Sequence, residues 1–394
     1  MRSLLCKSTF LIIATALLAP TALSQDKKTI KDYVEVGGYV RHMNSLSFID
    51  LDDILTDNLV HNRINLKAYL TDDFSLVGGI RNRIFYGQGT SLNPAFGDII
   101  DWDNGMVDMS FVLVDQNAMV IHSMVDRAYL KYTSDKLDIR LGRQRINWGM
   151  NLAWNPNDLF NTYTLIDFDY QERAGADAAR VQYFFNGQTS IDVACQYGDN
   201  LDESIIAGMF KFNRWEYDFQ VLGGSYYTDI AAGVGWAGNL KNMGLKGEAT
   251  YFHPKENYSD TSGVLSSSVT LDYSLKNGLY LNASVLYNSG GSNNATSGMN
   301  PFQSFMGTLS AKNLMPSMLT YFLQGSGAFT PALTGSLALF YMDGFKTYFY
   351  MPSISYSIQE NWELMLLGQV AMGDDGLGIE AIGHSVFLRL MFSY

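Results

Sequence analysis

The feature that most constrains this chain is a repeated alternation of apolar and polar residues, in segments of about ten residues. In the segment 62–70, for example, the apolar Ile64 and Leu66 alternate with Arg63 and Lys67. A period of two places these two sets on opposite faces of a β-strand. After residue 32 no apolar run reaches the roughly 18 residues of a membrane-spanning helix. The pattern therefore predicts strands with one face in lipid and the other in water.

The connections between these segments give an independent indication of topology. In bacterial barrels both termini face the periplasm, so the connections that follow even-numbered strands are short turns. The long connections, 87–123, 148–174 and 289–316, all follow odd-numbered segments. This sorting predicts an all-β, up-and-down antiparallel transmembrane barrel of about 18 strands, with 16 possible. The expected strands are 33–48, 58–71, 74–86, 124–134, 136–147, 175–187, 189–198, 203–213, 215–228, 230–240, 244–255, 262–274, 278–288, 317–329, 332–343, 345–357, 361–372 and 379–394.

The two ends of the chain carry signals for export and assembly. Arg2 and Lys7, a short apolar run and the small residues before Gln25 predict a signal peptide over 1–24. Residues 25–32 form a short periplasmic lead-in, and 33–394 form the barrel. In the last segment every second residue is apolar, and the segment ends in the aromatic Tyr394. This ending resembles the C-terminal signature of outer-membrane barrels, which implies recognition by the barrel-assembly machinery.

The amino-acid composition agrees with a transmembrane barrel and argues against a nucleic-acid-binding protein. Aromatic residues reach 13%, Gly is frequent (36) and Pro is scarce (8), as expected for strands with aromatic girdles. The net charge of -12 argues against nucleic acid as a partner. Removal of the signal peptide leaves Cys195 as the one cysteine, so an intrachain disulfide is not expected.

Basic residues concentrate in the first six expected strands, mostly on the face opposite the apolar stripe. A charge on the lipid face near the membrane midplane costs about 2–4 kcal/mol, so we expect these side chains to face inward. Arg143 and Arg145 share the parity of Leu141, and either a bulge at Gly142 turns them inward or they lie above the lipid zone. The expected pore lining is Arg63, Lys67, Arg81, Arg83, Arg127, Lys131, Arg140, Arg143, Arg145 and Arg180.

Acidic residues gather in the long connections. Two roles fit this arrangement. Inward-folded acidic loops facing a basic wall would create a transverse field across a constriction; alternatively, the carboxylates simply bind the arginines and hold the loops in place. The expected constriction-loop residues are Asp98, Asp101, Asp103, Asp158, Asp167, Asp169 and Glu172.

Catalytic and metal sites receive little support from the sequence. None of the five His makes a close pair at metal-ligand spacing with another His or Cys. Nucleotide-binding loops and the nucleophile elbow of hydrolases are also missing from the sequence. We therefore expect no metal, no cofactor and no enzymatic activity. A barrel lipase that uses Ser with His384 or His42 stays open, because such residues meet in space rather than in sequence.

One stretch resembles a known group of proteins. Residues 142–158 read GRQRINWGMNLAWNPND, and 172–177 read ERAGAD. Gly-Arg-Gln, then Trp-Gly, then Asn-Pro-x-Asp resembles porin-like outer-membrane barrels of the Bacteroidota type and, more distantly, alginate-export barrels. Ala174 stands where such families carry Pro. For alginate exporters the resemblance would imply an Arg-rich lumen that conducts an anionic polysaccharide.

These features together predict a porin-like channel in the cell outer membrane. Small hydrophilic, possibly anionic solutes would diffuse passively through an Arg-lined lumen narrowed by long extracellular loops. The alternative is a non-conducting barrel that acts as a receptor, adhesin or assembly subunit. Outer-membrane lipid, the assembly machinery and small solutes are the expected partners, and a monomer and a trimer both fit the sequence.

Overall fold

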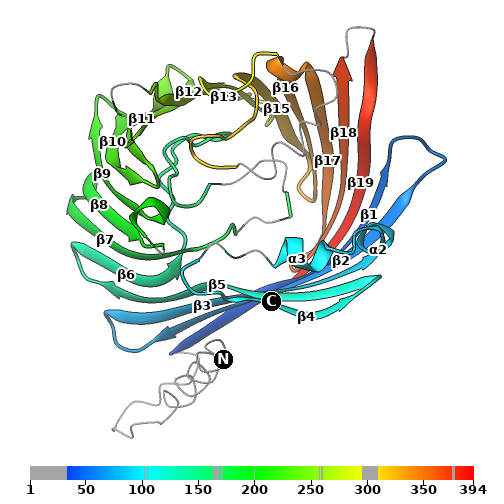
Figure 1. Cartoon of the computed structure of the whole chain (residues 1–394), viewed down its shortest axis with the longest axis horizontal. Helices are drawn as coiled ribbons and strands as arrows, with labels where there is room; N and C mark the ends of the chain where they lie inside the picture. The colour runs from blue at the N-terminus through cyan, green and yellow to red at the C-terminus, as the bar shows by residue number, and fades with distance from the viewer. Residues whose placement is uncertain are drawn as a thin grey trace, which may run out of the picture. The chain divides into compact units, whose positions relative to one another are not determined.

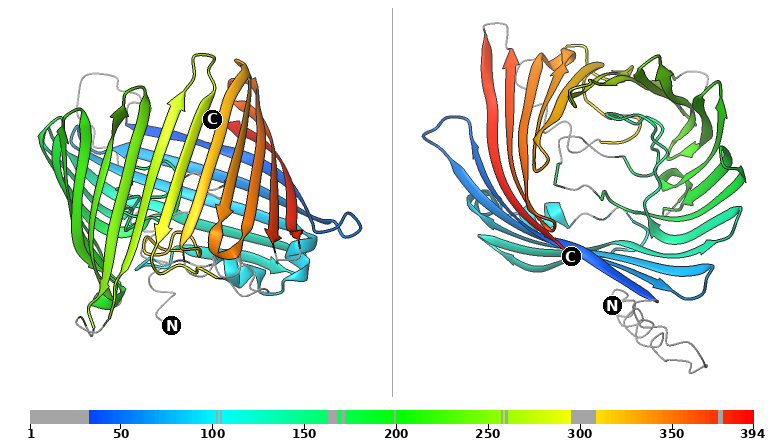
Figure 2. Two further views of the ribbon diagram at one scale, coloured as in Figure 1. Left: turned by 90° about the horizontal axis from the view of Figure 1, so that it is seen from above. Right: turned by 180° about the vertical axis from the view of Figure 1, so that it is seen from behind.

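The strands of this chain pair antiparallel in sequence order, and the last strand pairs with the first, so the sheet closes on itself (Figure 1). The closing ladder joins β1 (Val34–Phe48) to β19 (Ile379–Ser393), from Tyr39 opposite Ser393 to Phe48 opposite His384. Figure 2 shows the strands lying side by side around the wall and tilted to its axis, as closure of a barrel requires.

The sheet contains 19 strands, of which 18 form the closed wall. The expected fold class and strand number are therefore confirmed. The remaining strands of the wall are β2 (Leu55–Tyr69), β3 (Phe74–Gly87), β5 (Met119–Thr133), β6 (Leu137–Gln144), β7 (Ala176–Asn186), β8 (Thr189–Gln196), β9 (Ile205–Arg214), β10 (Tyr217–Tyr226), β11 (Asp229–Leu240), β12 (Met243–Pro254), β13 (Val264–Ser274), β14 (Tyr280–Asn288), β15 (Leu319–Thr330), β16 (Leu333–Met342), β17 (Thr347–Gln359) and β18 (Trp362–Asp374).

This computed structural model describes residues 33–101, 103, 105–162, 168–169, 172–198, 200–256, 258, 261–294, 309–374 and 378–394. The expected signal peptide over 1–24 and the lead-in over 25–32 lie outside the described residues. No helix among the described residues is long and apolar enough to cross a membrane.

Alternation along each strand separates an apolar outward face from an inward face. On β2, Ile64 and Leu66 are exposed whereas His61 and Arg63 are buried. The exposed set recurs around the wall, with Val221, Val285 and Leu366 among its members. Because side chains of one parity share one face of a strand, a continuous apolar belt covers the outside of the barrel.

The connection between β3 and β5 differs from the expected loop over 87–123. It contains two short helices, α2 (Gln88–Leu92) and α3 (Phe96–Ile100), and the strand β4 (Ser110–Gln116). Residues 119–124 of β5 pair with β4, whereas residues 128–133 pair with β6. β4 thus supplies hydrogen-bond partners where β6 no longer reaches, which is why β5 begins at Met119 rather than near 124.

The short turns lie where the sequence predicts them. Each short turn follows an even-numbered strand when the 18 strands of the wall are counted in order, leaving out β4. These turns are 70–73, 134–136, 187–188, 215–216, 241–242, 275–279, 331–332 and 360–361. At the turn between β9 and β10, Trp215 and Glu216 both adopt positive φ, of 54° and 64°. Two successive left-handed residues match the right-handed twist of a two-residue hairpin, although Asn and Gly are the usual choices there.

Candidate functional site

The interior of the barrel holds described parts of the connection between β6 and β7 (Figure 1). Ile146 and Trp148 are buried there, 0% and 2% exposed, and pack against small inward residues of the wall. Alanine at those wall positions leaves space for a second layer of chain inside the sheet. The wall residues are Ala176, Ala178, Ala194, Ala207 and Ala231.

One carboxylate on the wall anchors this connection. Glu248, on the inward face of β12, is 1% exposed. Its Oε1 accepts hydrogen bonds from the backbone N–H groups of Met150 and Asn151, the latter at 2.7 Å, and its Oε2 accepts from that of Asn157 at 3.0 Å. A loop cannot satisfy these N–H groups with its own ladder, so the carboxyl acceptor on the wall fixes its path.

Side chains of neighbouring strands continue this attachment. The indole Nε1 of Trp148 donates to Asp192 Oδ2 at 3.0 Å, and Arg180 pairs with the same carboxylate. Gln220 Nε2 donates to the carbonyl of Trp148 at 2.9 Å. Asn157 Nδ2 donates to the carbonyl oxygen of Val234 at 3.0 Å. Arg180, expected in the pore lining, thus helps to hold the inner connection.

Asp158 is a buried carboxyl within this connection. It is 1% exposed, and its Oδ1 lies 3.4 Å from the backbone nitrogen of Trp148. Burial raises the pKa of Asp158 to about 8, and Arg145 and Arg173 only partly oppose the shift. The side chain is therefore mostly protonated at neutral pH, so it is a structural group rather than an acidic group facing a pore.

A second apolar cluster covers the inward face of β14 to β18. Trp154, from the same connection, makes edge-to-face contacts with Phe322 and Phe340, with ring centroids 6.0 and 6.3 Å apart. Aromatic pairs in this geometry are favourable beyond the area they bury. The inner surface is thus not uniformly polar, as a simple lipid-out, water-in alternation would predict. Other members of the cluster are Leu286, Phe349, Met351, Met365 and Leu367.

The later part of the connection meets basic residues near the closing ladder. Asp169 lies 3.0 Å from Arg41 Nη1 and 3.0 Å from His61 Nδ1, with Arg389 at 4.0 Å. Glu172 accepts a hydrogen bond from the Tyr39 hydroxyl at 3.1 Å. Arg41, His61 and Arg389 are at most 3% exposed, so the two acidic residues join β1, β2 and β19 from inside.

A bulge places an acid beside Arg63. The pairing of β3 with β5 shifts between Gly79 and Ile80, so Gly79 lies opposite Arg127 and Ile80 opposite Val125. The extra residue is Asp126, which turns inward and receives two hydrogen bonds from Arg63, at 2.5 and 2.9 Å. Both partners are at most 2% exposed, so this bidentate pair is engaged within the wall.

Arg127 follows Asp126 and also turns toward the inner connection. Its guanidinium donates to the carbonyl oxygens of Glu172 and Arg173, at 2.6 and 2.9 Å. Two successive inward residues are possible only because the bulge interrupts the alternation. Arg127 therefore holds the backbone of the loop whose Glu172 side chain reaches Tyr39.

A chain of hydrogen bonds joins α3 to the wall. Arg83 lies 3.0 Å from His122 Nδ1, and His122 Nε2 lies 2.7 Å from Ser110 Oγ, which donates to Asp101 Oδ1 at 2.6 Å. Arginine only donates, so Nδ1 must accept and Nε2 must carry the proton. In this tautomer His122 cannot take a proton from Ser110. The arrangement therefore attaches the loop and does not activate a nucleophile.

Arg143 links β6 to the connection that contains β4 through hydrogen bonds. Its five N–H groups reach Asp177 twice, Asp103, and the carbonyl oxygens of Val125 and Val107, at 2.6–3.1 Å. β6 pairs with both neighbours without a register shift at Gly142, so the bulge, one of the two alternatives for Arg143 and Arg145, is not formed there. Gly142 instead adopts a φ of 118°, a conformation that favours glycine. With every donor engaged, Arg143 is a structural anchor.

Three of the expected basic residues, Lys67, Lys131 and Arg140, lie near the end of the barrel that carries the short turns and are partly exposed. Lys131 and Arg140 stand opposite each other on β5 and β6 and share Asp138, at 3.2 and 2.7 Å. Their side chains are 27% and 23% exposed. Lys67 donates to the Tyr69 hydroxyl at 2.5 Å, and that hydroxyl donates to Glu35. Two cations for one carboxylate leave a positive excess at the Lys131–Arg140 pair.

The other expected residues take varied positions. Arg81 is buried, and its Nη2 lies 3.7 Å from Met124 Sδ. Arg145 follows β6 and is half-buried, and Asp98 lies exposed in α3. Asp167 lies outside the described residues. Asp126 and Glu248 were not among the expected site residues, and the local sequence distinguishes neither: Asp126 faces inward through a register shift, and Glu248 shares its face of β12 with Lys246 and Thr250.

Carboxylates and basic residues are thus in direct contact at several places. Asp103 lies 2.6 Å from Arg143 and Asp169 lies 3.0 Å from Arg41, so these pairs do not face each other across a gap. Of the two roles left open by the sequence, loop attachment describes these pairs. Among the described residues, no group of three or more His, Cys, Asp or Glu is arranged to hold a metal.

Comparison with known proteins identifies the fold. No protein-family model matches the sequence, and no curated protein is significantly similar to it. Among solved structures, OccAB4 of Acinetobacter baumannii is similar with a TM-score of 0.57 and 10% identity, covering 94% of this chain and 100% of that one. The outer membrane protein OpdK of Pseudomonas aeruginosa has a TM-score of 0.57 and 8% identity, with 91% and 98% covered.

A structure of OpdK with vanillate is similar at a TM-score of 0.58, again at 8% identity and with 91% and 98% covered. At such identities the likeness concerns the fold alone. The chain therefore has the fold of a porin-like outer-membrane barrel. The closed wall and its apolar outer belt agree with a location in the outer membrane.

Proposed function

We propose that this barrel is an outer-membrane channel through which small hydrophilic solutes diffuse passively, with a preference for anions. The observation that carries the proposal is the positive excess at Lys131 and Arg140, which share one carboxylate and keep part of their surface exposed. Lys67, on the same face of the wall, extends this basic surface. A cleft lined by one sign of charge raises the local concentration of counter-ions and so favours their passage.

The remaining basic residues have a different role in this proposal. Arg63, Arg127, Arg143 and Arg180 hold the wall and the inner connection together, and their donors are engaged. The attached connection narrows the lumen and fixes its width. Charge selection then depends on the accessible cations, and pore size depends on the buried pairs.

The proposal also covers the relationship of this chain to other barrels and its processing during export. The motif over 142–158 supports kinship with porin-like barrels of the Bacteroidota type and a more distant one with alginate exporters. We propose that residues 1–24 are removed on export and that the last strand, ending in Tyr394, is recognised during assembly. The Tyr394 hydroxyl donates to the carbonyl of Arg63 at 3.1 Å, so the terminal residue also contributes to closure of the wall.

A second candidate is a sealed barrel that acts as a receptor, adhesin or assembly subunit. The observation that favours it is the close packing of Trp148 and Trp154 inside the wall, where each is at most 3% exposed. The two candidates differ in conductance. Purified protein in planar bilayers should give discrete current steps, and addition of vanillate, a small carboxylate, should reduce the chloride current. Absence of current at every voltage would support the sealed barrel instead.

A further inference from the structure

The outward face of the barrel carries a groove over β15 to β18. At this place five neighbouring outward positions have short or no side chains, and larger apolar residues stand around them. The groove has a volume of about 690 Å³, within the roughly 300–1,000 Å³ typical of small-molecule sites. Its floor is formed by Gly325, Gly327, Gly335, Pro352 and Gly368.

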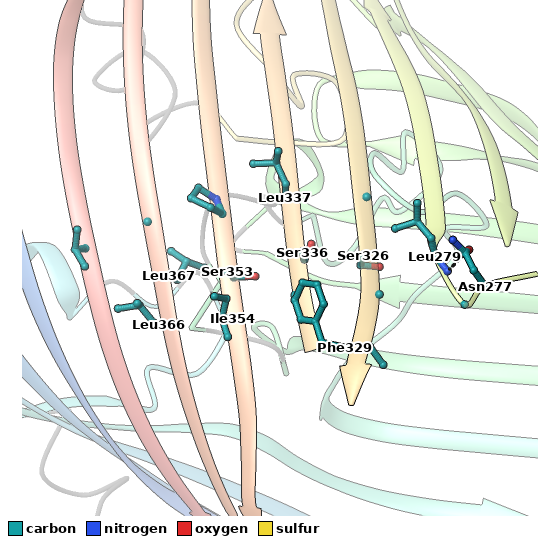
Figure 3. Close-up of a pocket in the computed structure, with 18 residues that line it drawn as sticks. Asn277, Leu279, Ser326, Phe329, Ser336, Leu337, Ser353, Ile354, Leu366 and Leu367 are labelled. Carbon is teal, nitrogen blue, oxygen red and sulfur yellow. Dashed lines mark hydrogen bonds between the residues drawn. The ribbon is translucent and has the colours of Figure 1, made fainter. Parts of the chain in front are cut away.

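The walls of the groove are branched and aromatic side chains. Figure 3 shows Leu279, Phe329, Leu337, Ile354 and Leu366 around the floor of the groove. Each of these side chains is at least 36% exposed, so they belong to the apolar belt.

The floor follows from the strand pairing. Gly325 lies opposite Leu337 and Gly327 lies opposite Gly335, so the floor crosses from β15 to β16. Pro352 has no N–H, and the pairing of β17 with β18 passes from Tyr350–Val370 to Ser353–Leu367 across it. The hollow is therefore a local depression in an otherwise continuous belt.

We propose that this groove binds one acyl chain of a phospholipid, with the lipid phosphate near Lys276. The groove is continuous with the lipid-facing surface of an outer-membrane barrel, so acyl chains reach it without displacing protein. A flexible chain can enter a concave groove, whereas the convex wall of a second barrel cannot fill it. The inference rests on the membrane location of the barrel and is independent of conduction.

Charge at the rim agrees with this occupant. Asn277 lines the groove, and the exposed Lys276 precedes it in the turn between β13 and β14. This turn belongs to the short set, which faces the periplasm in bacterial barrels. The periplasmic leaflet of an outer membrane consists of phospholipid, whose phosphate suits a lysine ammonium. Exposed aromatic residues at the same end, Phe329 and Trp362 among them, mark the membrane interface.

Two glycines of the floor allow the groove to be filled without disturbing the sheet. A Cβ on Gly325 would lie 3.5 Å from Leu281 Cδ2, and one on Gly327 would lie 3.6 Å from Leu279 Cδ1. Both are ordinary van der Waals distances, so Gly325→Leu and Gly327→Leu should place their side chains in the groove. Gly208, outward on β9, is the matched control, since its Cβ would lie 3.7 Å from Val193 Cγ2.

The test is native mass spectrometry of the barrel released from nanodiscs of phosphatidylethanolamine and phosphatidylglycerol. The unmodified chain should retain one phospholipid at collision energies that remove the others. Gly325→Leu and Gly327→Leu should each lower the retained fraction at least tenfold, Lys276→Gln should lower it several-fold, and Gly208→Leu should leave it unchanged. Equal retention in the filled variants would overturn the proposal, as would a change in oligomeric state in place of lipid loss.

An experiment on the unmodified chain covers the case in which both filled variants fail to assemble. A phospholipid with a photoreactive acyl chain, added to the nanodiscs, should crosslink mainly to peptides that contain Leu337 and Leu366. Crosslinks spread evenly around the belt would refute a specific site.

Discussion

Glu248→Ala should release the inner connection from the wall. The carboxylate of Glu248 accepts three backbone hydrogen bonds, from Met150, Asn151 and Asn157. If each contributes about 1 kcal/mol net, the loss is about 3 kcal/mol. At about 1.4 kcal/mol per tenfold, the ratio of attached to detached connection falls roughly a hundredfold. Glu248→Gln keeps one acceptor oxygen, that of the amide carbonyl, and should have a smaller effect.

Two assays follow detachment. Single-channel recordings should show frequent current fluctuations in Glu248→Ala that the unmodified chain lacks. Acrylamide should quench the tryptophan fluorescence of the variant more strongly, because Trp148 and Trp154 leave their buried sites. The matched control is Asp272→Ala, which removes an inward carboxylate of the adjacent strand that pairs with Lys246. Quiet channels and unchanged quenching in Glu248→Ala would refute the anchoring role.

Two further perturbations test the buried groups. Arg63→Met should lower the free energy of unfolding by about 3–5 kcal/mol, because it removes the bidentate partner of the buried Asp126 carboxylate. Adding Asp126→Leu should recover most of the loss in urea titrations, and an undiminished loss in the double variant would contradict this. The raised pKa of Asp158, about 8, means that the folded barrel binds more protons than the unfolded chain between about pH 4 and pH 8. Its contribution to stability is therefore present at acid pH and declines as pH rises, so Asp158→Asn should equal the unmodified chain at pH 4 and exceed it at pH 8; parallel curves would rule out this assignment.

Much of the wall was predictable from the sequence because it depends on residue alternation within each strand and on the length of each connection. Alternation on β2 separates Ile64 from Arg63, and the length of each connection follows from which end of the barrel it joins. Neither requires knowledge of distant contacts. The strand order and the inward face of the main basic residues follow from these two patterns alone.

The attachments inside the barrel were not predictable in the same way. Asp126 turns inward only because a bulge forms where β5 changes its pairing, and no residue type marks that position. Arg143 has the parity of an outward residue, and its burial depends on Asp103 and Val107 from a connection that folds over it. Glu248 meets loop residues about a hundred positions away. Such contacts depend on the tertiary path of the loops.

The apolar inward face of β14 to β18 shows the same limit. Phe322 and Phe340 alternate with outward apolar residues, so the strands read as apolar on both faces. Trp154 packs against these aromatic side chains, and Ala153, Leu314 and Met315 from the connections belong to the same cluster. A second layer of chain converts part of the lumen wall into a hydrophobic core.

The reversal potential across a planar bilayer, under a potassium chloride gradient, tests the central claim most directly. The unmodified channel should be anion-selective, and the combined change Lys67→Gln, Lys131→Gln and Arg140→Gln should shift the reversal potential toward that of a non-selective pore. Lys241→Gln, at a short turn, should leave it unchanged. A cation-selective unmodified channel, or the same reversal potential in the triple variant, would contradict the proposed role of these residues.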